Sequence, residues 1–181
     1  MSSVFEYGNP ARCIVGTVGL PGERAFYLQV TEGVRVTTIA IEKTQAAALT
    51  ERMREIVRNI ARQKKIPLAS TQRDDEPLQS PFDVDFRAGD MSILYLSDEA
   101  KLQIEIQEFN EQRVNESDDV EVPREGNDLA MVRIQLSVSQ SSEFVRRAEA
   151  VIQSGRQPCM FCGLPINPEG HLCPRANGYR R

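Results

Sequence analysis

The chain has 181 residues, with 40% hydrophobic residues, 27% charged residues and a formal net charge of −4. This composition is that of an ordinary globular protein, long enough to bury a core without disulfide staples. The negative charge argues against a general nucleic-acid binder, because neutralising phosphates requires clustered Lys and Arg side chains.

The first third of the chain predicts three strands joined by tight turns. Pro and Gly at Leu20-Pro21-Gly22, and Gly after Glu32, supply the backbone angles that tight turns need. The segments between these turns are rich in β-branched and aromatic residues, which favour strands. The predicted strands are 11–19, 24–31 and 34–42.

A long amphipathic helix is predicted next, from an N-cap at Thr44 to about Arg62. Apolar side chains recur at helical spacing and charged side chains lie between them, so one face is expected to pack on a sheet. The apolar positions are Leu49, Met53, Ile56, Val57 and Ile60.

The second half repeats this order after a polar segment, 64–83, that predicts a surface loop. Alternating apolar residues then predict strands with one face in water. The predicted strands are 84–97, 101–109 and 129–138, with a polar, acidic connection over 110–127. A second amphipathic helix follows, with Ser139 or Ser141 as its N-cap and Gly155 at its end.

These elements predict an α+β fold, in which an antiparallel sheet packs against two amphipathic helices. The order of three strands and a helix occurs twice, which suggests a duplicated β-β-β-α unit. We expect an α+β domain over residues 1–155 and a zinc-binding C-terminal tail, a zinc knuckle, over 156–181.

The tail carries the strongest chemical signal of the sequence. Three of the four cysteines and the only histidine fall within 15 residues, at Cys159, Cys162, His171 and Cys173. A Cys-x-x-Cys pair followed by Gly163 can bend over one ion, and thiolate with imidazole is a donor set that zinc prefers. The spacing therefore predicts Zn2+ held by these four side chains.

Four protein ligands close a tetrahedral shell, whereas a catalytic zinc keeps one position for water. The predicted zinc is therefore structural, and Glu169 is interpreted as a solvated loop residue rather than a general base. The fourth cysteine, Cys13, lies in an apolar strand and is expected to act as a small buried hydrophobe.

Beyond the ligands the tail is basic. Arg175, Tyr179, Arg180 and Arg181 can contact a phosphate, a nucleic acid or an acidic partner, with Tyr179 stacking. The alternative interpretation packs Tyr179 on the body and pairs the arginines with surface carboxylates.

Apolar runs are all shorter than the roughly 20 residues of a membrane span. The N-terminal stretch MSSVFEYGNPAR lacks the basic start and apolar core of a signal peptide. We therefore expect a cytoplasmic protein with reduced thiols and no membrane span.

Two stretches of the chain resemble an uncharacterised actinobacterial family of conserved hypothetical proteins. They are FEYGNPARCIVGTVGLPGERAFYLQ and CMFCGLPINPEGHLCPRANGYRR. That family is a domain of unknown function with a C-terminal Cys3His zinc-ribbon-like motif, which Cys159, Cys162, His171 and Cys173 match. The resemblance implies a zinc site and brings no established activity.

No phosphate-binding loop, dinucleotide fingerprint or nucleophile elbow is present. The leading hypothesis is a non-enzymatic binding or adaptor protein with a structural zinc and a protein partner. The alternatives are a nucleic-acid-contacting module that uses the basic tail, and an enzyme acting on a phosphorylated small molecule. The sequence does not decide whether the protein is an enzyme.

Overall fold

The computed structural model describes residues 3–20, 22–64, 73–110, 129–154, 159–164, 166 and 170–175. Their regular elements, in chain order, are β1 (Val4–Tyr7), β2 (Arg12–Val18), β3 (Ala25–Glu32), β4 (Arg35–Ile41), α1 (Lys43–Lys64), β5 (Phe86–Leu96), β6 (Lys101–Glu108), β7 (Met131–Ser137) and α2 (Val138–Gln153). The α+β class is therefore confirmed. In the described part of the chain, no helix combines the length and the apolar character needed to cross a membrane.

The strands form one seven-stranded sheet in the order β1-β7-β6-β5-β4-β3-β2. The predicted sheet was antiparallel throughout, and the observed sheet is mixed, because β1 pairs with β7 and β4 with β5 in parallel. The β4–β5 pairing is parallel because α1 carries the chain back to the starting end of β4. Each half does supply an antiparallel meander followed by a helix, but this order alone does not show a duplication.

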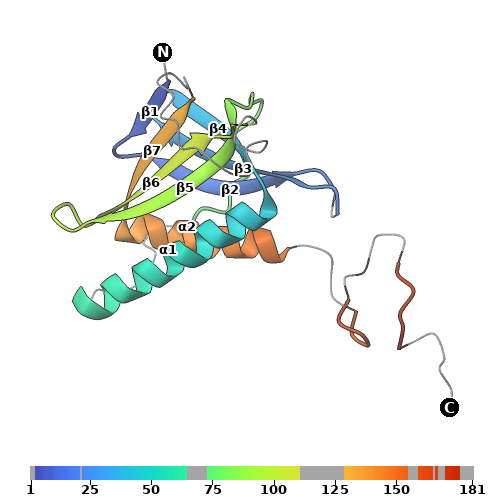
Figure 1. Ribbon diagram of the computed structural model, residues 1–181. Helices are drawn as coiled ribbons and strands as arrows, with labels where there is room; N and C mark the ends of the chain where they lie inside the picture. The colour runs from blue at the N-terminus through green and yellow to red at the C-terminus, as the bar shows by residue number, and fades with distance from the viewer. Residues whose placement is uncertain are drawn as a thin grey trace, which may run out of the picture.

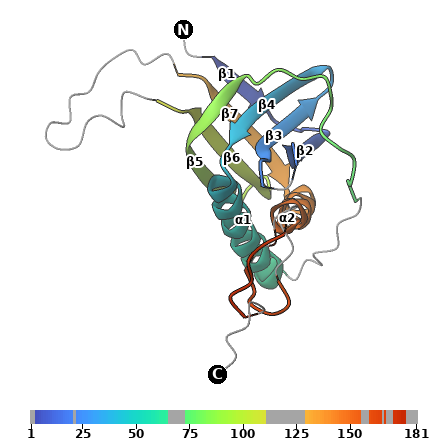
Figure 2. The ribbon, with the colours of Figure 1, turned by 90° about the vertical axis from the view of Figure 1, so that its right-hand side faces the viewer.

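The sheet curls so strongly that α2 contacts both β2, at one edge, and β7, next to the other edge. Figures 1 and 2 show α1 and α2 side by side on the open side of this curved sheet. Across the enclosed core, the Tyr7 hydroxyl lies 2.7 Å from Thr37 Oγ1, which joins β1 to β4. The apolar faces of all seven strands and both helices meet in one hydrophobic cluster.

Both helices bury the faces that their sequences predict, but they begin elsewhere. Helix α1 begins at Lys43 rather than after an N-cap at Thr44, since Ala46 N–H already donates to Glu42 O. The N-cap of α2 is Ser137, not Ser139 or Ser141, because Ser137 and Gln140 form a reciprocal capping box. The predicted stop at Gly155 lies outside the described residues.

Strand β1 was not predicted. Its four residues pair with β7, more than 120 residues later in the chain, so the partner that makes it a strand is absent from its local sequence.

Residues 73–85 have no regular secondary structure, as predicted for 73–83, whereas the strand predicted from 84 begins at Phe86. Most of these residues are exposed, as in a surface loop, and the segment runs over the outer face of β2–β4 (Figure 2). Leu78 occupies the space above Gly16, where a Cβ atom would lie 2.5 Å from Leu78 Cγ. Farther along, the Phe82 ring packs edge-on against Tyr27, with ring centroids 5.2 Å apart. This part of the sheet is therefore covered on both faces.

Arginines from the body hold segment 73–85 at its N-terminal end. The Arg12 guanidinium makes two hydrogen bonds to the Asp74 carboxylate and also donates to the carbonyls of Glu76 and Pro77. Arg147, a buried residue of α2, donates to Asp74 Oδ1 at 3.1 Å and to the Asp74 and Glu76 carbonyls. The charge of a buried guanidinium is thereby met by one carboxylate and several carbonyl oxygens.

A buried glutamine holds the middle of the segment. The Gln29 amide donates to Gln79 O at 3.2 Å and accepts from Gln79 N–H at 2.8 Å, so its side chain pairs with the backbone as a strand would. The same amide donates to Thr38 Oγ1.

We predict that Gln29→Met lowers the free energy of unfolding by about 1–3 kcal/mol, because it leaves the Gln79 backbone groups without their partner. Urea unfolding measures this effect. Gln79→Ala is the matched control, since Gln79 contributes its backbone to the pairing, and we expect it to be near neutral. Equal losses in the two variants would contradict the assigned contact.

A second prediction concerns pH. Hydrogen bonds and charge from Arg12 lower the pKa of Asp74 in the folded protein, and the Arg147 charge acts in the same direction. In the unfolded chain the pKa of an Asp carboxyl is about 3.9. A lowered folded-state pKa means that the stabilisation is fully present above that value and is lost as the pH falls through the folded-state pKa.

We therefore expect Asp74→Asn to lower stability near neutral pH and to reduce the acid-dependent loss, as measured by urea unfolding across pH. Asp83→Asn, which neutralises an exposed carboxylate of the same segment, is the control. If the unfolding free energy of Asp74→Asn falls with decreasing pH as steeply as that of wild type, the arginine contacts of Asp74 do not contribute as assigned.

Candidate metal centre

The first described residues of the tail form a tight turn that includes Cys159 and Cys162. Gly163 N–H donates to Cys159 O, and Cys159 N–H donates to Leu164 O, each at 2.8 Å. Gly163 has φ 74°, a left-handed conformation that favours glycine, as its position after the second cysteine predicts. The turn brings the two thiols to the same side of the backbone.

The second pair of predicted ligands joins them. The ligand atoms of Cys159, Cys162, His171 and Cys173 all lie within 4.8 Å of one another, so the four residues form a cluster capable of holding a metal ion. Gly170, with φ 91°, turns the chain just before His171.

The distances within the cluster suit a tetrahedral ion. A sulfur–zinc bond of about 2.3 Å places two thiolates about 3.8 Å apart across a tetrahedron. Cys159 Sγ and Cys173 Sγ are 3.8 Å apart, and Cys162 Sγ lies 3.2 Å from His171 Nε2. The donor set and its spacing therefore fit a zinc ion.

The backbone favours the thiolate form of Cys159, whereas burial raises the pKa of the Cys162 thiol. Phe161 N–H donates to Cys159 Sγ at 3.4 Å. This hydrogen bond, together with one from Cys162 N–H, lowers the pKa of the Cys159 thiol. Cys159 and Cys173 are buried, while Cys162 and His171 are half-buried, so the small segment surrounds its own sulfur atoms.

The other predicted site residues are placed only in part. The Arg175 guanidinium donates to Phe161 O at 3.2 Å, so it stabilises the turn that contains Cys159 and Cys162. Tyr179, Arg180, Arg181 and Glu169 lie outside the described residues. Cys13 is half-buried rather than buried as predicted; it packs against the body core, away from the cluster, and desolvation of the thiol raises its pKa to about 12.

Apolar side chains on the surface of the tail were not singled out from the sequence. Met160 is 87% exposed and Leu172 is 84% exposed, and Phe161 and Leu164 are also exposed. The signal was present, because a segment this short that places four side chains around a possible metal position cannot bury its remaining apolar residues as well. Figure 1 shows the described parts of the tail beyond the end of α2.

A family model described as "Protein of unknown function (DUF3090)" matches residues 5–173, a span that contains the sheet except Val4, both helices and all four metal-capable residues. No curated protein and no solved structure matches the chain.

We predict that the purified protein carries about one metal ion per chain and that Cys162→Ser removes most of it, because one of four ligands is lost. Elemental analysis of protein prepared without chelator measures both values. Cys13→Ser is the matched control, since it replaces the cysteine outside the cluster and should retain the metal. Metal-free wild-type protein would refute the assignment.

Proposed function

The chain belongs to the DUF3090 family of proteins of unknown function, and we propose that it is a non-enzymatic binding protein whose zinc-ordered C-terminal tail contacts a protein partner. In this proposal the α+β domain spans residues 1–155 and the tail spans 156–181. The cytoplasm, where thiols stay reduced, is the compartment in which such a site keeps its ligands.

The role of the zinc follows from the number of its ligands. Cys159, Cys162, His171 and Cys173 fill a tetrahedral shell, which leaves no position for a water nucleophile or a substrate. An ion held in this way contributes folding energy to a segment that has too few residues for a hydrophobic core. The zinc is therefore proposed as a structural support for the surface around it.

The observation that carries the proposal is the exposure of apolar side chains around this metal turn. Met160, Phe161 and Leu172 are 87%, 58% and 84% exposed. Single exposed apolar residues are common on proteins, but several on one short metal-bound segment are typical of a contact surface. Phenylalanine and methionine are also enriched at the centres of protein–protein interfaces.

The experiment compares proteins cross-linked to wild type in native lysate with those cross-linked to Phe161→Ser/Leu172→Ser. We expect specific partners to be lost in the double variant while its metal content stays at the wild-type value, because neither residue is a ligand. The matched control is Val34→Ser, which removes a 99% exposed apolar side chain from a hairpin turn of the body. Retention of the same proteins by the double variant would overturn the proposal.

A further inference from the structure

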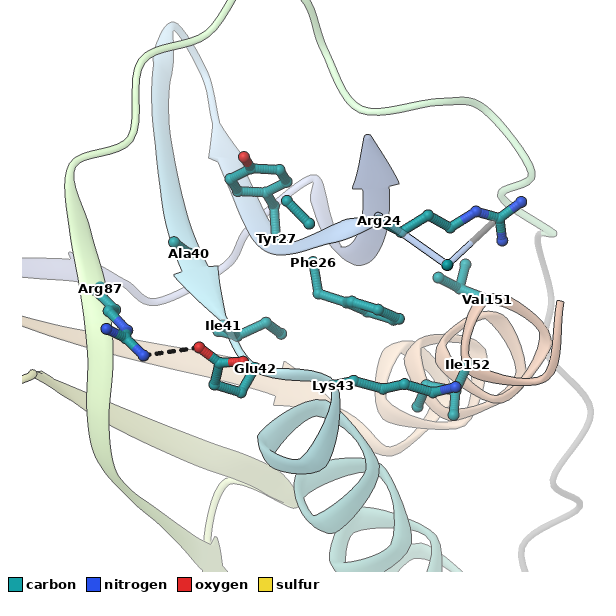
Figure 3. A pocket seen from close by; sticks show the side chains of 12 residues that line it. Arg24, Phe26, Tyr27, Ala40, Ile41, Glu42, Lys43, Arg87, Val151 and Ile152 are labelled. Atoms are coloured by element: carbon teal, nitrogen blue, oxygen red, sulfur yellow. Dashed lines mark hydrogen bonds and ion pairs between the residues drawn. The ribbon is translucent and has the colours of Figure 1, made fainter. Parts of the chain in front are cut away.

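A cavity of about 350 Å³ lies between the strand ends of β3 and β4 and the C-terminal turn of α2. Figure 3 shows its two kinds of lining. Apolar side chains form one part, with Phe26, Ile41, Val151 and Ile152 from three elements. The charged part consists of Arg24, Glu42, Lys43 and Arg87.

The charges of the lining do not cancel. Arg87 and Glu42 form an ion pair at 2.8 Å, and the Arg87 guanidinium also lies over the Phe109 ring. Arg24 and Lys43 have no carboxylate partner among the described residues. The cavity therefore has an excess of two positive charges in a protein whose net charge is −4.

The two remaining cations are positioned differently. Arg24 donates to Ser154 O at 2.9 Å and to Ser154 Oγ at 3.0 Å, which fixes its guanidinium at the end of α2. Lys43 is exposed and is the first residue of α1, whose first turn contains no acidic side chain. In Figure 3 the Phe26 ring lies between these two cationic side chains, beside Val151 and Ile152.

We propose that this cavity binds a small organic anion with an apolar body, its carboxylate or phosphate between Arg24 and Lys43 and its body against Phe26, Val151 and Ile152. Guanidinium and ammonium groups recognise both kinds of anion by charge-assisted hydrogen bonds. Few polar groups beside an apolar wall are the usual composition of a small-molecule site. The cavity holds the volume of about a dozen waters, which suits a ligand of about ten heavy atoms.

This site is separate from the metal centre, so the inference stands or falls independently of the proposed zinc-dependent contact. The proposed anion binding involves no catalytic step, and its site lies in the body of the protein rather than in the tail.

The test uses four probes on the full-length protein: octanoate, octyl phosphate, 1-octanol and inorganic phosphate. The first two share the proposed chemistry and distinguish its carboxylate and phosphate forms. We expect one or both to bind with a dissociation constant on the order of 0.1–1 mM, as small ligands do. 1-Octanol lacks the anionic group and inorganic phosphate lacks the apolar body, so we expect each to bind at least about tenfold more weakly.

Methyl NMR locates the binding, with shifts expected at Ile41, Val151 and Ile152. Lys43→Gln should weaken the anions about fivefold or more and leave octanol unchanged, because only the ionic contact is lost. Arg58→Gln is the matched control, since it removes one positive charge from the exposed face of the same helix, outside the cavity.

Arg24→Gln provides a second variant, and thermal unfolding of each variant shows whether the fold is retained. Absence of anion binding at millimolar concentration would overturn the proposal. So would shifts at methyl groups remote from the cavity, or equal affinities in Lys43→Gln and Arg58→Gln.

Discussion

The buried charge of Arg147 is the constraint on which the outer layer of this fold depends. Because the Arg147 guanidinium is buried, water cannot satisfy its N–H groups, and protein oxygen atoms must accept their hydrogen bonds. The acceptors come from segment 73–85, which supplies the Asp74 carboxylate and the carbonyls of Asp74 and Glu76. Because these backbone groups must face Arg147, the segment is held against the sheet from its first described residues onward.

That attachment determines which faces of the sheet are available for binding. Segment 73–85 covers the outer face of β2–β4, through Leu78 above Gly16 and Gln79 paired with Gln29. The inner face is filled by the common core and closed by the two helices. Protein therefore packs on both faces of this part of the sheet, and the cavity proposed above as an anion site lies at the strand ends beside α2.

The sequence predicted the features whose causes are local. The alternation over 101–109 and the helical spacing from Leu49 to Ile60 each identify a buried face. The spacing of Cys159, Cys162, His171 and Cys173 likewise identifies a metal-capable cluster before any fold is known. The Ser137–Gln140 capping box was also readable, but the strand pattern continued through Val138 and moved the expected boundary. Strand β1 and the Gln29 contacts were not readable, because their partners lie far away in the chain.

The end of α2 connects the body of the protein to its tail. Arg24, directly before β3, donates to Ser154, which precedes Cys159, the first of the four metal-capable residues, by only five residues. The preceding turn of the helix gives Val151 and Ile152 to the cavity wall. One guanidinium therefore belongs to the charged lining of the cavity and also fixes the last described residue of the body. An anion that competes for Arg24 would act on its contact with Ser154, whereas the metal-capable cluster is built from hydrogen bonds and side chains of its own.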